Sequence, residues 1–175
     1  MNSSFAVRRA ASNDAVQIAS LGASVFASTH GQAVNKNELL RYLKDSYSVC
    51  TVSRDIRDDS KDIFVSTNSD GQVVGFIYLA RGSGVEAVSS TLNAVELQRI
   101  YVHPSAHGKG VGSKLATRAE ELALELGFRA IWLGVWESNL KAIEVYMRWG
   151  YKQVGNRDFT IGNVIQKDII MLKGI

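Results

Sequence analysis

Three glycines at alternate positions, Gly108, Gly110 and Gly112, lie in the stretch HPSAHGKGVGSKL, between an apolar run and a row of helix-forming residues. Glycines let a backbone approach a ligand closely, and the first free N–H groups of a helix, with the positive end of its dipole, favour an anion. A phosphate or pyrophosphate is the ligand that this loop predicts. A tight strand-to-helix connection without a ligand is the alternative, which a short glycine pattern taken alone favours.

The spacing of the loop excludes two nucleotide-binding motifs. A P-loop requires G-x-x-x-x-G-K-[ST], but Lys109 precedes the second glycine and Ser113 directly follows Gly112. A dinucleotide-binding fingerprint requires G-x-G-x-x-G and an acidic residue about 20 positions further on, whereas these glycines run G-x-G-x-G. The chemistry of the loop therefore depends on the elements that position it.

Those elements alternate between strand and helix patterns, without a repeat or a linker. Predicted strands cover residues 5–10, 62–67, 72–80, 94–102 and 129–136, with two more within 151–172. The first predicted helix runs from cap residues 12–14 through Val25, and the second covers 35–47 with an apolar stripe of Leu39, Leu40 and Leu43. Two more predicted helices cover about 110–125 and 139–149. Residues 50–60 are ambiguous, and 81–93 form a loop.

Composition narrows the classes of protein to consider. With 46% apolar residues among 175, residues 1–175 are expected to form a single domain. The net charge of +3 is too small and too evenly spread to predict binding to nucleic acid or a membrane surface. A lone cysteine, Cys50, forms no internal disulfide, and neither a signal peptide nor a membrane span is found, so a cytoplasmic location is expected.

The order of these features resembles that of the GCN5-related N-acetyltransferases (GNAT). The resemblance is detailed over residues 96–115 (ELQRIYVHPSAHGKGVGSKL) and 132–155 (WLGVWESNLKAIEVYMRWGYKQVG). The stretches WLGVWESN and DFTIGNVIQKDIIML are most similar to polyamine acetyltransferases of the PaiA type. The implied fold class is α/β: a mixed, mostly antiparallel twisted sheet of six to seven strands flanked by helices, split between its fourth and fifth strands.

The resemblance implies acetyl-CoA as the co-substrate. Main-chain N–H groups of the loop would hold its pyrophosphate, namely those of His107, Gly108, Lys109, Gly110, Val111, Gly112 and Ser113. His107 stands where the family usually has Gln or Arg, and Lys109 either adds a charge near a phosphate or is solvated. The main chain of Ile100, Tyr101 and Val102 would pair with the pantetheine arm, and the Val102 N–H would face the acetyl carbonyl.

Asn139 and Tyr146 are seven residues apart, so they lie on one face of the last predicted helix, with Ala142 and Ile143 between them. Asn139 is expected to cap this helix, to contact the pantetheine amide, or both. Tyr146 taken alone is a buried aromatic residue. The family pattern, which places Ala142 and Tyr146 against the cofactor, implies that its hydroxyl protonates the departing thiolate.

The proton of the incoming amine needs an acceptor. Glu96 lies at the start of the central strand, where related enzymes often hold a general base, and an exposed strand-end glutamate is the competing interpretation. Glu137 is a weaker candidate that is expected to help cap the following helix. His30, His103 and His107 show no metal-ligand spacing with a third convincing ligand, so no metal is predicted.

The predicted function is acetyl transfer from acetyl-CoA to a primary amine, with a polyamine as the acceptor that the subfamily resemblance implies. A peptide N-terminus or a lysine stays open as acceptor, and a CoA-binding sensor or interaction domain without turnover is the alternative of another class. The acceptor groove is expected between residues 21–47 and 81–93. The apolar ending DIIMLKGI permits a homodimer through the C-terminal strands without requiring one.

Overall fold

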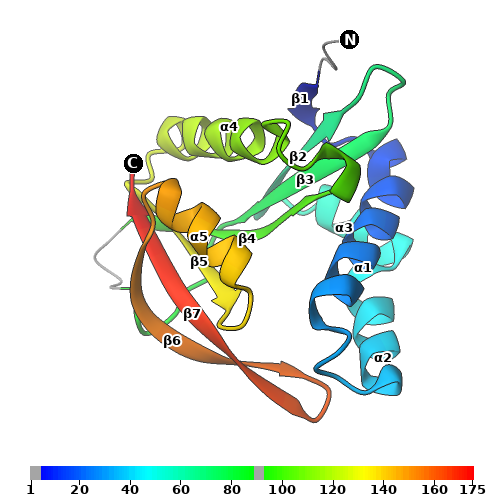
Figure 1. The fold of residues 1–175 in the computed structure, drawn as a ribbon. Coiled ribbons are helices and arrows are strands. Elements are labelled where there is room, and N and C mark those ends of the chain that lie inside the picture. Colours follow the sequence, from blue (N-terminus) through cyan, green and yellow to red (C-terminus); the bar gives the residue numbers. More distant parts are fainter. Residues whose placement is uncertain (1–4, 89–92) are drawn as a thin grey trace.

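The computed structural model describes residues 5–88 and 93–175, and within them seven strands form one twisted sheet (Figure 1). The order across the sheet is β1-β2-β3-β4-β5-β7-β6. The neighbouring strands are antiparallel except for β4 and β5, which are parallel. The strands are β1 (Ala6–Arg9), β2 (Lys61–Thr67), β3 (Val73–Ala80), β4 (Ala94–Val102), β5 (Ala130–Trp136), β6 (Lys152–Ile161) and β7 (Val164–Gly174).

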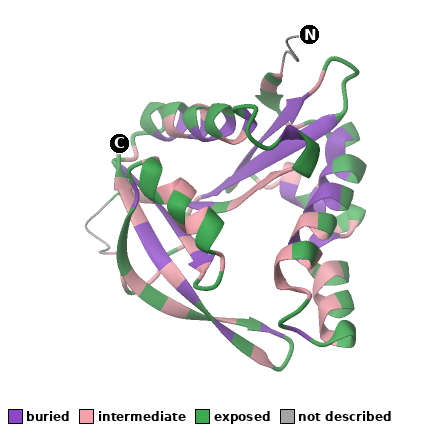
Figure 2. Cartoon of the chain, in the orientation of Figure 1, coloured by how far each residue is buried: buried purple, intermediate pink, exposed green. Residues whose placement is uncertain are grey.

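Helices cover both faces of this sheet (Figures 1 and 2). One face packs against α4 (Val111–Glu125) and α5 (Leu140–Arg148), and the other against α1 (Ala15–His30), α2 (Lys36–Tyr47) and α3 (Val49–Ile56). Two short 3₁₀ turns, Ser12–Asp14 and Pro104–Ala106, precede α1 and follow β4. The fold class expected from the sequence is therefore confirmed.

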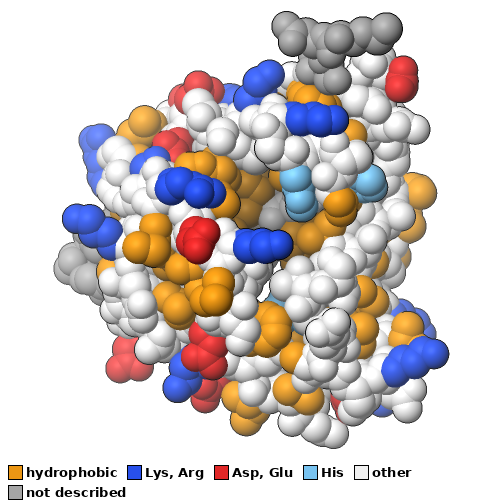
Figure 3. All heavy atoms as spheres, in the orientation of Figure 1, with side chains coloured by type: hydrophobic (Ala, Val, Ile, Leu, Met, Phe, Trp, Pro, Cys, Tyr) orange, Lys and Arg blue, Asp and Glu red, His pale blue; other side chains and the backbone are white. Residues whose placement is uncertain are grey.

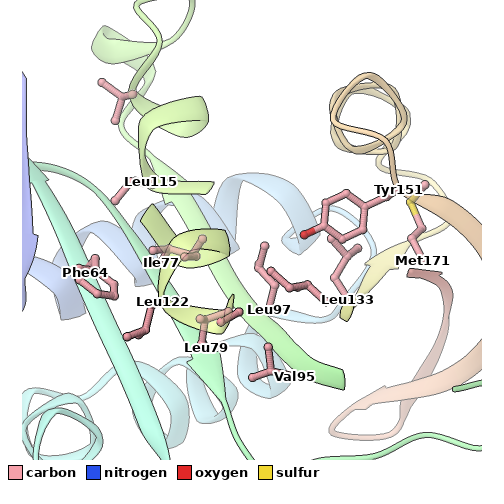
Figure 4. Packing of buried hydrophobic residues seen from close by; sticks show 14 of the residues in the cluster. Phe64, Ile77, Leu79, Val95, Leu97, Leu115, Leu122, Leu133, Tyr151 and Met171 are labelled. Atoms are coloured by element: carbon pink, nitrogen blue, oxygen red, sulfur yellow. The ribbon is translucent and has the colours of Figure 1, made fainter. Parts of the chain in front are cut away.

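Alternation along the strands divides the core into two layers. On β3, Val74, Ile77 and Leu79 face α4, while Phe76 and Tyr78 face α1 and α3. Figure 4 shows the α4-side layer, in which side chains of β2, β3, β4 and α4 continue into Leu133, Tyr151 and Met171. This layer thus extends from the β2–β3–β4 half of the sheet to the β5–β7 half.

Two local predictions change in the structure. The ambiguous segment contains α3, which begins after Ser48, whose hydroxyl accepts a hydrogen bond from the Thr51 N–H (3.2 Å). Leu40 was wrongly placed in the apolar stripe of α2, because it is 54% exposed, whereas Leu39 and Leu43 pack on the aromatic cluster around Phe26. Residues 89–92 of the predicted loop 81–93 lie outside the described residues.

No helix in the described ranges combines the length and the apolar character required to cross a membrane.

A buried carboxylate fixes the start of α1. Asp14 is 2% exposed, and its two oxygens accept hydrogen bonds from the Arg8 guanidinium (2.6 and 2.8 Å). It also accepts the Ala11 N–H (2.7 Å). These bonds, the one from Arg8 above all, hold the pKa of Asp14 below its ordinary value. Strand β1 and helix α1 are thereby joined by one side chain.

We predict that Asp14→Asn lowers the free energy of unfolding by about 1–2 kcal/mol at pH 7, since the charged partner of a half-exposed arginine is lost. An acid with a lowered pKa stabilises the fold above its ordinary pKa, and this contribution is lost as the pH falls through the lowered value. The difference from the wild type, measured by urea unfolding, should therefore shrink between pH 5 and pH 3. Asp70→Asn, in an exposed turn, serves as the control, and a difference independent of pH would contradict the assignment.

Candidate active site

The parallel strands β4 and β5 are paired over only three residues each. Ala94, Val95 and Glu96 pair with Ala130, Ile131 and Trp132, and beyond these pairs the two strands separate. Strand β4 also carries a bulge, because its register with β3 passes from Leu97 to Arg99 and leaves Gln98 without a partner. A hollow bordered by hydrophobic side chains opens in this region, between α4 and α5 (Figure 3). We refer to the space between β4 and β5 beyond Glu96 and Trp132 as the split.

The register with β3 shows which main-chain groups of β4 face the split. Val102 lies opposite Gly75 in the ladder. The residues that flank this pair are hydrogen-bonded to each other, with the His103 N–H donating to the Val74 carbonyl (2.8 Å). In an antiparallel ladder this pattern directs the N–H and C=O of Val102 away from β3, and those of Ile100, two residues earlier, likewise. Tyr101 differs from the expectation, because its main-chain groups point to β3.

The glycine loop presents unpaired N–H groups at the start of α4. Gly110 is the helix N-cap and has φ +78°, a left-handed conformation that favours glycine. The first main-chain bond into α4 goes from the Lys114 N–H to the Gly110 carbonyl. Within residues 5–88 and 93–175 no protein acceptor is found for the N–H groups of Gly108, Gly110, Val111, Gly112 and Ser113. This donor set, with the helix dipole, suits a pyrophosphate.

The loop, the end of β4 and α5 meet at one point. The His107 side chain is bonded to β4, with Nε2 donating to the Val102 carbonyl (2.9 Å). A Cβ atom added to Gly112 would lie 3.6 Å from the Trp149 ring and 3.7 Å from the Val102 side chain. His107, the residue that departs from the family pattern, therefore has a side-chain role in holding the loop to the strand.

Helix α5 presents one face to the core. Asn139 caps it, since its Oδ1 accepts the Ala142 N–H (3.3 Å). Ala142, Ile143 and Tyr146 all pack on the α4-side layer, as their spacing predicts. The Tyr146 ring makes edge contacts with Trp149 and Tyr151, each at 5.9 Å between centroids. Burial raises the pKa of Tyr146 well above its ordinary value, so its hydroxyl keeps its proton at neutral pH.

Glu96 is buried on the opposite face of the sheet. Its neighbours Val95 and Leu97 belong to the α4-side layer, and Glu96, 6% exposed, points to the other side. The interpretation as an exposed strand-end glutamate is therefore wrong. Glu96 belongs to the last pair of the β4–β5 ladder, so it marks the closed end of the split. Glu137 does not cap α5, because Asn139 does, and its N–H bonds the Lys167 carbonyl.

Arg157 and Asp168, which sequence reasoning missed, complete the surroundings of Glu96. The Arg157 guanidinium lies 3.7 Å from Glu96 Oε1 and 3.4 Å from Asp168 Oδ2, over the Trp132 ring. Gly134 makes room for them, since a Cβ there would lie 2.8 Å from Arg157. Burial raises the pKa of Asp168, and Arg157 opposes this shift. Two carboxylates and one guanidinium give the cluster a net charge of −1.

An aromatic cluster lies on the same side of the sheet, beside the end of β4. The Tyr101 hydroxyl lies 2.8 Å from that of Tyr47, and burial raises the pKa of Tyr101 to about 12. Arg99 lies over the Tyr47 ring (4.7 Å) and pairs with Asp55 (3.8 Å). The tyrosine hydroxyls therefore stay protonated, and Asp55 is shared between the half-buried Arg99 and Lys61, whose ammonium group lies 2.5 Å from it.

Comparison with known proteins decides the family. The model of the acetyltransferase (GNAT) family matches residues 33–151, which include the loop, both strands of the split and α5. The chain belongs to this family. It is an N-acetyltransferase, and the match begins in the turn after α1.

Individual relatives agree with this assignment. The chain is 27% identical over 160 residues to an uncharacterized N-acetyltransferase of Mycobacterium tuberculosis, covering 91% of this chain and 97% of that protein. A probable spermine N(1)-acetyltransferase of Bacillus subtilis subsp. natto is 33% identical over 76 residues, covering 43% and 50%. The PaiA N-acetyltransferase of Thermoplasma acidophilum, solved in complex with coenzyme A, has the same fold, with a TM-score of 0.79 at 20% identity, over 98% and 99% of the chains.

We predict that Arg157→Met lowers the free energy of unfolding by about 1–3 kcal/mol at pH 8, because it leaves two buried carboxylates without their counter-ion. The charge of an acid with a raised pKa, here Asp168, destabilises the fold above that pKa, so the loss should diminish as the pH falls through the raised value. Urea unfolding at several pH values measures this. Arg157→Lys, which keeps the charge, is the control. An equal loss at every pH would show that Arg157 matters only through packing on Trp132.

Proposed function

We propose that this N-acetyltransferase transfers the acetyl group of acetyl-CoA directly to a primary amine. The split between β4 and β5 carries the proposal, since it opens where the glycine loop presents its unpaired N–H groups. The separated strand edges suit the amides of a pantetheine arm, as for an added strand, and the loop suits a pyrophosphate. Donors, strand edges and a hydrophobic hollow together fit acetyl-CoA.

Acetyl-CoA supplies an acetyl group activated as a thioester, and the residues around the split would position it. Ile100 and Val102 offer main-chain groups to the pantetheine arm, and Gly108 and residues 110–113 offer theirs to the pyrophosphate. The N–H groups of His107 and Lys109, also expected to bind it, are instead bonded to the Pro104 and Ala106 carbonyls (3.2 and 3.4 Å). The Val102 N–H, directed into the split, is the proposed donor to the acetyl carbonyl, a type of contact typically worth about 3 kcal/mol. Asn139, Ala142 and Tyr146 would contact the arm from α5.

Tyr146 is the proposed general acid. It is half-buried on the α4–α5 side of the sheet, and its hydroxyl, with a raised pKa, remains protonated at neutral pH. As the carbon–sulfur bond breaks, this hydroxyl would give its proton to the thiolate of CoA. Its surroundings contain aromatic rings and no acid or base in direct contact, so no neighbouring charge in the described structure removes that proton first.

Glu96 is the proposed general base, acting directly or through a water molecule. An amine is mostly protonated at pH 7, so a proton must leave before nitrogen can attack carbon. Glu96 and Tyr146 lie on opposite faces of the sheet, so in the proposed mechanism the base would act from the acceptor side and the acid from the CoA side. The net charge of −1 on the cluster of Glu96, Arg157 and Asp168 would attract a cationic amine.

A polyamine is supported as acceptor by the printed activity of the Bacillus relative and by the likeness to PaiA. A peptide N-terminus or a lysine side chain uses the same chemistry. A CoA-binding domain without turnover is the alternative of another class, against which the protonated Tyr146 and the buried Glu96 carboxylate both argue. Incubation of the protein with acetyl-CoA and a panel of spermidine, spermine, n-butylamine and peptides, following free thiol, separates them: CoA binding without amine-dependent thiol release would overturn the proposal.

We predict that Tyr146→Phe lowers kcat about 10²-fold, the lower end of the usual effect of a general acid. The dissociation constant of acetyl-CoA should stay within about twofold, because the ring and its packing are kept. Tyr151→Phe is the control, since Tyr151, which is 3% exposed, also has a raised pKa and touches Tyr146. Equal kcat values for Tyr146→Phe and the wild type would remove Tyr146 as the acid.

A further inference from the structure

Five aromatic side chains form a continuous series of ring contacts across the acceptor side of the split. In order from β4 to β5 they are Tyr101, Tyr47, Phe26, His30 and Trp136. The distances between successive ring centroids are 6.1, 5.7, 4.3 and 4.9 Å. Both ends of the series lie beyond Glu96 and Trp132, the last pair of the β4–β5 ladder. The series, here called the ring bridge, therefore connects the two strands where they no longer pair.

The ring bridge lies on the same face of the sheet as Glu96. Trp136 pairs with Asp168 of β7, and the side chains of directly paired residues share a face. The Asp168 carboxylate lies beside Arg157, which also pairs with Glu96. An amine that approaches Glu96 from the open end of the split must therefore pass the ring bridge.

A hollow of about 420 Å³, here called the end hollow, lies on the other side of the ring bridge, beyond the end of β5. On the acceptor side of the sheet its lining residues are Ala33, Trp136, Val164 and Gln166. Because β7 runs antiparallel to β5, Gln166 lies farther from Glu96 than Asp168 does. Trp136 and Gln166 both contact His30. His30 therefore stands between the end hollow and the carboxylates beside the split.

His30 is the movable member of the ring bridge. Of the other four rings, two are buried and two are carried by strands. His30 is half-buried and is the last residue of α1. A hydrogen bond from its Nδ1 to Gln166 Oε1 (2.9 Å) holds the ring in place. Burial lowers the pKa of His30, so its ring is neutral at pH 7 and can rotate without moving a charge.

The opening that His30 controls has the width of one ring. Rotation of the imidazole would leave a gap between Phe26 and Trp136, which it now contacts on either side. An unbranched alkylamine is one methylene wide and fits such a gap. A polypeptide or a ring-bearing amine is wider, and its passage would require α1 to move. That helix is packed into the core through Ile18 and Leu21, so its displacement would disrupt the close packing there.

We propose that His30 is a specificity-determining residue for the acceptor, whose ring closes the path from the end hollow to the split and opens it for narrow, unbranched primary amines. The proposal rests on the proposed function, because the amine that His30 selects is the acceptor of that reaction. A peptide N-terminus, or a lysine within a polypeptide, would have the required nitrogen but would be excluded by width.

Two amines of different width test the wild-type protein. n-Butylamine and cyclohexylmethylamine both carry their nitrogen on a CH₂ group, so they differ in width rather than in the reacting group. We expect kcat/KM for n-butylamine to exceed that for cyclohexylmethylamine at least about tenfold. Equal values, or a higher value for cyclohexylmethylamine, would overturn the role of His30 and leave the proposed function standing. Absence of amine-dependent thiol release with either amine would instead overturn the proposed function.

Two substitutions of His30 separate the width of its ring from its hydrogen bond. His30→Ala removes the ring, so the preference for n-butylamine over cyclohexylmethylamine should fall at least about fivefold. His30→Phe keeps a ring and loses the bond to Gln166, so the preference should stay within about twofold of the wild type. Each ratio is measured within one variant, so a loss of folded protein cancels. An unchanged ratio in His30→Ala, or an equal fall in both variants, would contradict the proposal.

Tyr42→Ala is the matched control. The Tyr42 ring stacks on Phe26 at 4.5 Å between centroids but lies outside the ring bridge, so its loss should leave the ratio unchanged. Trp136→Leu removes the partner of His30 on β5 and should lower the ratio as His30→Ala does, which keeps the test decisive if His30→Ala does not fold. A fall in Tyr42→Ala as large as in His30→Ala would show that general packing of the aromatic cluster sets the preference, against the proposal.

Discussion

The parallel pairing of β4 with β5 stops after three residue pairs, and the arrangement of the candidate active site depends on that limit. Each strand is held on its outer side, β4 by β3 and β5 by β7, over most of its length. The bulge at Gln98 and the attachment of Arg99 to Tyr47 and Asp55 fix β4 toward α2 and α3. The inner edges of β4 and β5 therefore separate, and main-chain groups in the split have no partner on the opposite strand. Buried main-chain groups require hydrogen-bond partners.

This separation also divides the chemistry between two faces. The α4–α5 face beside the split is apolar and aromatic, and there a half-buried tyrosine keeps its proton because desolvation raises its pKa. The other face holds Glu96, Arg157 and Asp168, where a net negative charge suits an incoming cation. In the proposed mechanism Glu96 thus takes a proton on one face of the sheet and Tyr146 gives a proton on the other. The split between β4 and β5 connects the two faces.

The sequence was sufficient where function depends on local pattern. The loop with Gly108, Gly110 and Gly112, the strand before it, and Asn139 and Tyr146 on one helix face all lie within short segments, whose spacing determines their geometry. Arg157 and Asp168 were missed because they approach Glu96 only through the order β5-β7-β6, which no local pattern shows. The walls of the acceptor groove, expected within residues 21–47 and 81–93, stay a prediction.

Hydrogen exchange of main-chain amides, with and without CoA, tests most directly whether the split and the loop hold the cofactor. We expect slower exchange on CoA binding at Ile100, Val102, Gly108 and residues 110–113, because their N–H groups gain acceptors. The paired residues Val95 and Ile131, already within the ladder, should show no comparable change. Unchanged exchange at Val102 and in the loop, under conditions where CoA binds, would contradict the account.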